Sequence, residues 1–277
     1  GLARRAPLMV PLPESAWALR ERVAGNPEVS RHAPHAGGML CFMLTGGTTG
    51  ASKVVRVTHA MALHELRAYP EVAPTLSNRD KVLQHTNVLW AASALGQLDI
   101  ALAFGAGICI SGAADQEAIA AHGATILGIV PSALDALDPR TAPSVRSVFT
   151  WGEPLPQPLA TRWRSAQVEV IELLISTEYW LSFFCRGAAS PNGRSLYQTV
   201  EGLEFGVLVQ DTGELGTSPG SVGELVIRGP MVTLGYENGG GGASAFVDVK
   251  GFDGPFFRTH DLVRLSEGEG GRVEVEF

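Results

Sequence analysis

The sequence is poor in several features that would each point to a class of protein. No apolar run approaches the roughly 18 residues that cross a bilayer as a helix, so no membrane-spanning segment is expected. The 21 basic residues are scattered and outweighed by 28 acidic ones, which argues against a nucleic-acid partner because such binding needs clustered Lys and Arg. No Cys/His spacing is typical of a zinc site.

Cysteine is also scarce, with only Cys41, Cys109 and Cys185 in 277 residues. Cys41 and Cys109 lie in apolar runs, which indicates core thiols of a protein in the reducing cytoplasm. Two arginines near the N-terminus precede no sustained apolar stretch, so we expect no signal peptide. Because no Met starts the chain, we expect a processed or excised piece of a longer protein.

Strand and helix patterns alternate along most of the chain. An apolar run predicts a buried strand at 39–44, and the stretch that follows predicts a helix around 58–68. From residue 107 the alternation is typical of βαβ units and a mostly parallel sheet. The expected strands are 107–110, 124–130, 147–150 and 168–174, and the expected helices are 114–122, 131–137 and 156–164.

The pattern changes near residue 195, where strand-like runs begin to recur between glycine-rich turns. These runs are 203–209, 222–228 and 256–264. We therefore expect an α/β fold in two parts. Residues 1–195 would form a core with a mostly parallel sheet flanked by helices, and residues 196–277 a smaller β-rich subdomain. A further short helix is expected at 13–24 and a flexible surface loop at Gly239–Gly242.

The strongest chemical pattern is a loop of glycines and hydroxyls that follows the first strand, LTGGTTGASK from Leu44 to Lys53. Glycines allow backbone N–H groups to approach an anion, hydroxyls donate further hydrogen bonds, and lysine adds a positive charge. The spacing of Gly and Lys differs from that of a Walker loop. The alternative to a phosphate-binding loop is a tight Gly/Thr turn followed by a surface lysine.

The longer string from Leu44 to His59, LTGGTTGASKVVRVTH, resembles the phosphate-binding signature of the adenylate-forming superfamily. That superfamily includes acyl-CoA synthetases, luciferases and nonribosomal adenylation domains, and the string looks most like the aryl-acid-activating enzymes of siderophore assembly. Four further stretches resemble family motifs in the expected order. They are Trp151–Leu155, Ser176–Glu178, Gly223–Tyr236 and Phe257–Leu262.

The resemblance implies a reaction and a role for each matching residue. The reaction is attack by a carboxylate on the α-phosphorus of ATP, so the protein must align two anions and neutralise the phosphates. Glu178, beside Thr177, would hold Mg²⁺, and Asp261 would accept hydrogen bonds from the ribose. The phosphates would be bound by Thr45, Gly46, Gly47, Thr48, Thr49, Gly50 and Lys53, and the adenine would lie against Gly152, Glu153, Pro154 and Leu174.

This sequence departs from the family pattern at several places. Leu174 and Ile175 stand where the family has an adenine-stacking Tyr and a Gly, His260 replaces the Gly before the ribose Asp, and Ser52 replaces a Pro. Loss of aromatic stacking costs about 1 kcal/mol. Only 44 residues precede Thr45, and the chain stops at Phe277, before the family's C-terminal lid subdomain and its catalytic lysine. We therefore assign no catalytic residue and expect this chain alone to be incomplete or weakly active.

Amino-acid-activating relatives carry an Asp for the substrate ammonium at the position that aligns here with Ala91 or Ala92. A buried ammonium without a counter-ion costs several kcal/mol, so a substrate without an α-amino group is expected. Asp99, the nearest acid, is expected on the following helix. Trp90, Ala91, Ala92 and Trp151 would line an apolar pocket, or else they belong to the plain core.

Together these patterns predict ATP- and Mg²⁺-dependent activation of a carboxylic acid, with an aryl acid favoured. The acyl-AMP would pass to a carrier-protein phosphopantetheine or to CoA, within or beside the other domains of a synthase. The alternative is a degenerate adenylation fold that serves as a non-catalytic scaffold in a larger synthase.

Overall fold

The computed structural model describes residues 37–45, 53–87, 90–187, 190, 193–209, 214–237 and 245–277. These residues group into two compact units, and each is described by itself. The first unit contains the described residues of 65–172, and the second contains those of 36–64 and 173–277. The domain boundary expected from the sequence at residue 195 stays a prediction.

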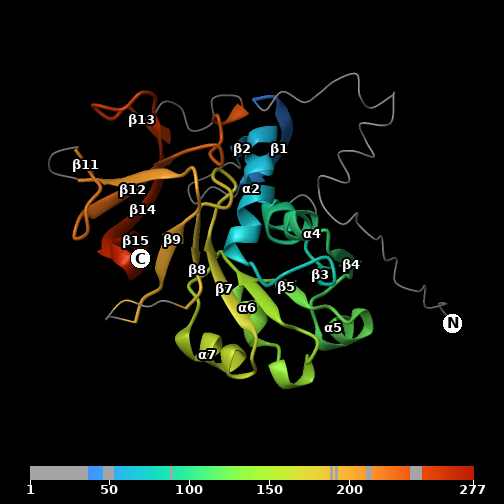
Figure 1. The fold of residues 1–277 in the computed structure, drawn as a ribbon. Coiled ribbons are helices and arrows are strands. Elements are labelled where there is room, and N and C mark those ends of the chain that lie inside the picture. Colours follow the sequence, from blue (N-terminus) through green and yellow to red (C-terminus); the bar gives the residue numbers. More distant parts are fainter. Residues whose placement is uncertain are drawn as a thin grey trace. The chain divides into compact units, whose positions relative to one another are not determined.

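The first unit is built on a parallel sheet with the strand order β7-β6-β5-β3-β4 (Figure 1). Helices connect its strands, as the alternating sequence pattern predicts. The strands are β3 (Lys81–Gln84), β4 (Gly107–Ile110), β5 (Ile126–Gly128), β6 (Ser147–Thr150) and β7 (Glu169–Leu174). The helical elements are α2 (His59–Val72, shared with the second unit), α3 (Ala91–Ser93), the π-helix η1 (Ala94–Leu98), α4 (Asp99–Phe104), α5 (Gln116–His122), α6 (Pro131–Asp135), the 3₁₀ turn η2 (Pro139–Thr141) and α7 (Gln157–Ser165).

The core of the first unit forms because its central strands are apolar on both faces. Every residue of β5 and β6 is buried, which is typical of strands covered on both sides. Helices contribute Ile119 of α5 and Trp163 of α7 to the same cluster, and both side chains are fully buried. The predicted strands and helices between residues 107 and 174 are thereby confirmed to within a few residues at their ends.

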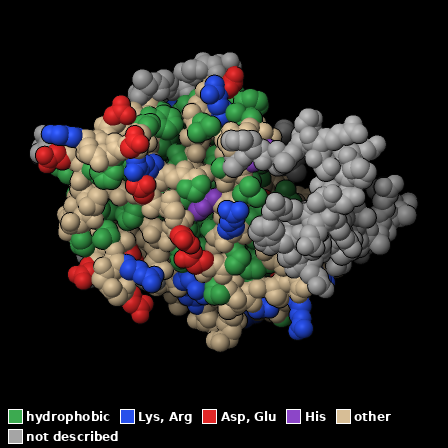
Figure 2. All heavy atoms as spheres, turned by 45° about the horizontal axis from the view of Figure 1, so that its top comes forward, with side chains coloured by type: hydrophobic (Ala, Val, Ile, Leu, Met, Phe, Trp, Pro, Cys, Tyr) green, Lys and Arg blue, Asp and Glu red, His purple; other side chains and the backbone are tan. Residues whose placement is uncertain are grey.

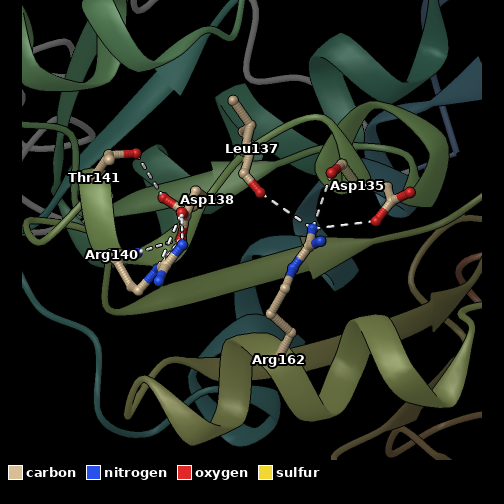
Figure 3. Close-up of polar contacts among 6 residues, drawn as sticks. All are labelled: Asp135, Leu137, Asp138, Arg140, Thr141 and Arg162. Carbon is tan, nitrogen blue, oxygen red and sulfur yellow. Dashed lines mark hydrogen bonds and ion pairs between the residues drawn. The ribbon is translucent and has the colours of Figure 1, made fainter.

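Polar side chains close the helix ends on the outside of this core. Asp138 caps the start of η2, accepts a hydrogen bond from the backbone N–H of Arg140 at 2.9 Å and pairs with its guanidinium (Figure 3). Arg162 of α7 reaches the last carbonyls around α6, at 2.9 Å from Asp135 O and 3.1 Å from Leu137 O (Figure 3). Both sets of contacts satisfy groups that a helix end leaves unpaired. Those of Arg162 also fix α7 to the end of α6.

The second unit is built on an antiparallel sheet with the order β11-β10-β12-β14-β15-β9-β8, to which β13 adds along β14. Its core includes Leu225, Phe257, Leu265 and Val275. The prediction of a β-rich region with strands at 203–209, 222–228 and 256–264 is confirmed. The strands are β8 (Phe183–Cys185), β9 (Leu196–Thr199), β10 (Glu204–Leu208), β11 (Leu215–Gly216), β12 (Val222–Arg228), β13 (Phe246–Val247), β14 (Phe256–Glu267) and β15 (Val273–Glu276), with the 3₁₀ turn η5 (Glu269–Gly271) between the last two.

A separate hairpin of β1 (Met39–Thr45) and β2 (Lys53–Thr58) belongs to the second unit. The predicted strand at 39–44 is confirmed, but the prediction that it is buried is wrong. The side chains of Phe42 and Leu44 are 55% and 58% exposed. The reason is that β1 pairs with β2 in a two-stranded sheet and is not inserted between strands of the larger one.

Surface charge is mixed on the described residues. On the face shown in Figure 2, Lys and Arg side chains are interspersed with Asp and Glu and do not gather in one area. None of the helices in the described part of the chain combines the length and apolar character needed to cross a membrane. The predicted helix at 13–24 and the Gly239–Gly242 loop lie outside the described residues.

Candidate nucleotide-binding site

The hairpin β1–β2 brings together the two ends of the glycine/threonine loop. Thr45, the last residue of β1, lies directly opposite Lys53, the first residue of β2. The loop residues between them, Gly46, Gly47, Thr48, Thr49 and Gly50 among them, lie outside the described residues. Thr58, the last residue of β2, then caps the start of α2, because its Oγ1 accepts a hydrogen bond from Met61 N at 3.3 Å.

The Lys53 ammonium lies over an aromatic ring. Its Nζ is 4.8 Å from the centroid of the Tyr236 ring, within the range of a cation–π contact. The backbone places this tyrosine, because Val55 of β2 forms a β-bridge with Tyr236 and Arg56 N donates to Gly235 O at 3.1 Å. The chain around Tyr236 is thus paired with β2 immediately after Lys53.

The tyrosine in turn contacts the predicted metal-binding carboxylate. Tyr236 Oη donates to Glu178 Oε1 at 2.9 Å, and Ser176 Oγ donates to Glu178 Oε2 at 3.1 Å. Ser176 also closes the turn Ser176–Tyr179, since its N–H donates to Tyr179 O at 2.9 Å. Burial, and then the nearby charge of Glu178, raises the pKa of Tyr236 well above its ordinary value, so the phenol remains a donor.

Asp261 is presented by a bulge in β14. Between the pairs Val226↔Arg258 and Glu224↔Leu262, one residue of β12 faces three of β14. The extra residues turn Asp261 so that its Oδ2 accepts from Tyr179 Oη at 3.4 Å, while its own N–H donates to Thr259 Oγ1 at 3.1 Å. Burial raises the pKa of the Asp261 carboxyl, although the hydroxyls of Thr259 and Tyr179 act in the opposite direction.

His260, at the centre of this bulge, has a left-handed backbone with φ of 65°. This conformation is easy for glycine and costs other residues about 1–2 kcal/mol. The side chain is 65% exposed, and its Nδ1 lies 3.0 Å from Glu224 Oε1. Arg258 holds the same carboxylate with Nε at 3.0 Å. Burial opposes ionisation of Glu224, but the hydrogen bonds and charge of Arg258 hold its pKa below the ordinary value.

In the first unit, the turn after β6 carries Trp151, Gly152, Glu153 and Pro154. Trp151 is buried, whereas the three residues after it are exposed. Glu153 caps the start of α6, because Ser132 donates to it through its backbone N–H at 2.9 Å and through Oγ at 2.8 Å. Gly152 has φ of 80°, which allows the sharp turn between the tryptophan and this cap.

The Trp151 indole lies directly against the backbone of two glycines. A Cβ built at Gly96 would lie 2.2 Å from the Trp151 ring, and one built at Gly128 would lie 2.6 Å from it. Such distances leave no room for any side chain, so both positions require glycine. Gly96 lies in η1 and Gly128 ends β5, so the indole fixes the π-helix to the sheet.

The family model of AMP-binding enzymes matches residues 6–237, which is most of the chain. The chain belongs to the AMP-binding enzyme family. Nonribosomal peptide synthetase 7 of Gibberella zeae is 29% identical over 243 residues, a match that covers 79% of this chain and 5% of that protein. The chain therefore spans only a small part of the length of this relative.

Solved structures show that the chain has the adenylate-forming fold. The N-terminal subdomain of Klebsiella oxytoca NpsA, in complex with 3-hydroxyanthranilyl-AMSN, matches with a TM-score of 0.73 and 23% identity over 91% of this chain and 68% of that one. An artificially fused adenylation–PCP di-domain, NpsA-ThdA, matches with a TM-score of 0.73 and 22% identity over 88% of this chain and 51% of that one.

The predicted site residues fall into two groups, one in each unit. In the second unit, Lys53 and Glu178 are linked through Tyr236, and Asp261 is linked to the same turn through Tyr179. Leu174 ends β7 and packs, partly buried, against the core of this unit. The first unit holds Trp90, Ala91, Ala92, Trp151, Gly152, Glu153 and Pro154.

Within the predicted acid pocket, Trp90 is 45% exposed, and Ala91 and Ala92 are buried in α3. Asp99 begins α4, as expected, but it is buried and its Oδ2 has no hydrogen-bond partner among the described residues. Burial raises the pKa of Asp99 to about 7.

Sequence reasoning did not assign a role to Tyr236, Tyr179, Gly96 or Gly128. Tyr236 stands at the end of a quoted motif, and Tyr179 directly follows another, so adjacency to the motifs was the available signal. For Gly96 and Gly128 the available signal was a glycine within a helical and a strand pattern, which often marks a close approach. Nothing in the sequence identified which ring approaches them.

Proposed function

We propose that this chain is the nucleotide- and acid-binding core of an ATP-dependent enzyme that converts a carboxylic acid to an acyl-AMP. In this reaction a carboxylate oxygen attacks the α-phosphorus, a P–O bond forms, and the bond to the leaving pyrophosphate breaks. The protein contributes by aligning the anions and by stabilising the charge on the phosphates.

The arrangement in the second unit carries this proposal. Lys53, at the exit of the glycine/threonine loop, Glu178 and Asp261 come from distant parts of the chain, yet two tyrosines of one unit link them to a single turn. A cation for phosphates, a carboxylate for a metal and a carboxylate for ribose hydroxyls together match the needs of a magnesium nucleotide.

The residues present are suited to Mg²⁺. Glu178 is half-buried and offers hard oxygen ligands, and its two bonds to hydroxyls leave other lone pairs available. Thr177 lies beside it in the turn. When bound, Mg²⁺ would neutralise phosphate charge that Lys53 alone does not. We propose Glu178 as its protein ligand, with Thr177 adjacent.

We propose an acid without an α-amino group, with an aryl acid favoured. Ala91, Ala92 and Trp151 are apolar and buried, so none of them supplies a charge for an ammonium group. Because burial raises the pKa of Asp99 to about 7, this residue is not a permanent counter-ion for an ammonium at neutral pH. The NpsA complex with 3-hydroxyanthranilyl-AMSN agrees with an aryl acid.

The acceptor is proposed to be the phosphopantetheine thiol of a carrier protein, or CoA. The matching adenylation–PCP di-domain supports the first of these and the participation of other synthase domains. In either case the thiolate would attack the acyl carbonyl and AMP would leave.

The test is calorimetry with ATP, with and without Mg²⁺, followed by ATP–pyrophosphate exchange with a panel of acids. We expect Mg-ATP binding that falls about 10- to 100-fold in Lys53→Ala, because a charge-assisted contact is lost. Arg79→Ala, which removes an exposed cation from the loop between α2 and β3, is the control. Benzoic and salicylic-type acids should support exchange better than any proteinogenic amino acid, and the reverse order would overturn the pocket assignment.

A non-catalytic scaffold is the second candidate, favoured by Leu174 and His260. Leu174 packs, partly buried, against the core where the family has an aromatic ring, and His260 adopts a strained backbone where the family has glycine. This candidate predicts that the wild-type chain binds neither ATP nor Mg-ATP in the same calorimetry.

A further inference from the structure

We infer that Tyr236 is a positioning residue for Glu178, the carboxylate proposed to bind Mg²⁺. The Tyr236 hydroxyl orients Glu178, and its ring holds the Lys53 ammonium. The inference rests on the proposed function and assigns a task to a side chain that touches neither substrate nor metal. Tyr236 would thereby couple the phosphate-binding cation to the metal-binding anion.

The contacts of Glu178 support this role. Its two carboxylate oxygens accept from two different hydroxyls, Tyr236 Oη at 2.9 Å and Ser176 Oγ at 3.1 Å. A carboxylate that accepts one bond on each oxygen cannot rotate freely and still keeps lone pairs for a metal. Partners of this kind orient a ligand, and their loss typically costs 10- to 100-fold in metal affinity.

The backbone around Tyr236 is fixed well enough to act as a support. Thr233, which is buried, donates through Oγ1 to Arg56 O at 2.7 Å and accepts at the same oxygen from Gly235 N at 3.1 Å. Gly235 has φ of 118°, a conformation suited to glycine. Together with the bridge from Val55 to Tyr236, these bonds set the direction in which the tyrosine leaves the chain.

The ring has a second task that a simple packing role does not require. Lys53 Nζ lies 4.8 Å from the ring centroid, so the ring holds the ammonium of the lysine in a cation–π contact. Tyr236 also packs against the core of the second unit. A purely structural tyrosine would need only that packing, which phenylalanine would preserve.

The experiment compares Tyr236→Phe, Tyr236→Leu and wild type in binding ATP at a series of Mg²⁺ concentrations. Tyr236→Phe keeps the ring and loses the hydrogen bond, so we expect half-maximal Mg-dependent binding to need about 10-fold more Mg²⁺, with Mg-free ATP affinity unchanged. Tyr236→Leu should in addition weaken Mg-free ATP binding several-fold, because the cation–π contact is lost.

The control is Tyr197→Phe, which removes the hydroxyl of a buried tyrosine on β9 whose ring packs against Phe277. It should leave the Mg²⁺ dependence as in wild type. If wild type binds Mg-ATP and Tyr236→Phe shows the same Mg²⁺ dependence, the positioning role is refuted and the proposed function stands. If wild type does not bind Mg-ATP at any Mg²⁺ concentration, both the proposed function and this role are refuted.

Discussion

The carboxylate of Asp261 has a tyrosine hydroxyl and a backbone bulge arranged around it, which is more support than a surface carboxylate needs. We expect Asp261→Ala to weaken AMP and ATP binding alike by about 10-fold or more, since the ribose loses a charged acceptor. Pyrophosphate binding should not change. Calorimetry with the three ligands checks this.

A conservative control for that prediction is Tyr179→Phe, which removes only the hydrogen bond to Asp261 Oδ2. It should give a smaller loss for AMP and ATP than Asp261→Ala. Equal AMP affinity in wild type and Asp261→Ala would mean that the ribose lies elsewhere.

The buried carboxyl of Asp99 predicts a pH dependence of stability. Its pKa is about 7 in the folded state, against roughly 3.9 in an unfolded chain. As pH rises from about 4 to about 7, the unfolded chain releases this proton before the folded chain does. The free energy of unfolding therefore falls over that range because of Asp99, and above about pH 7 Asp99 causes no further change.

Asp99→Asn cannot release a proton, so its stability relative to wild type should increase across the same pH range, by about 1–4 kcal/mol. Urea unfolding between pH 5 and 8 measures the difference. Asp248→Asn, at an exposed carboxylate, is the matched control and should show no such trend. A difference for Asp99→Asn that does not vary with pH would contradict the raised pKa.

Among the elements, η1 and β5 depend on the contact between two glycines and one ring. Gly96→Ala would place a methyl group 2.2 Å from Trp151, so η1 or the indole must move. We expect a loss of about 1–3 kcal/mol, the usual cost of overpacking a core. Gly112→Ala is the matched control, because its Cβ would meet nothing within 4 Å. Chemical denaturation should show a large effect for the first substitution only.

The bulge of β14 is an element whose shape depends on one strained residue. Because His260 has φ of 65°, a β-branched residue there should be strained more than histidine is. We expect His260→Val to cost about 1–2 kcal/mol of stability and to weaken AMP binding by displacing Asp261. Leu262→Val, on the same strand and 64% exposed, is the control. Equal melting temperatures and AMP affinities of the two variants would show that the bulge tolerates any residue.

At the scale of the whole molecule, each compact unit has its own apolar core. Regions with separate cores tend to open as separate cooperative units. Trp163→Ala, in the core of the first unit, should lower amide protection mainly in residues 107–172. Leu225→Ala, in the core of the second, should lower it mainly in residues 196–277.

Hydrogen exchange read by mass spectrometry compares the two variants. Both substitutions remove fully buried side chains and should cost several kcal/mol. Equal loss of protection in both regions, whichever core is altered, would show that the chain unfolds as one cooperative unit.

The amino-acid sequence by itself determined the order and type of most elements and the identity of the family. Apolar runs and glycine or proline boundaries are local, so the strands and helices from 107 to 174 were predictable from neighbouring residues alone. Lys53, Glu178 and Asp261 lie within short motifs that resemble those of the family, so the sequence sufficed to name them as candidates, and their roles stay predictions.

Tertiary structure decided how those motifs contact one another and which residues outside them touch their side chains. The burial of β1 was predicted wrongly because an apolar run does not reveal how many strands will pair with it. Tyr236 contacts Glu178 from 58 positions away, and Trp151 contacts Gly96 within the first unit. Contacts of this kind depend on how elements distant in sequence pack, and packing is a property of the folded chain that no local pattern contains.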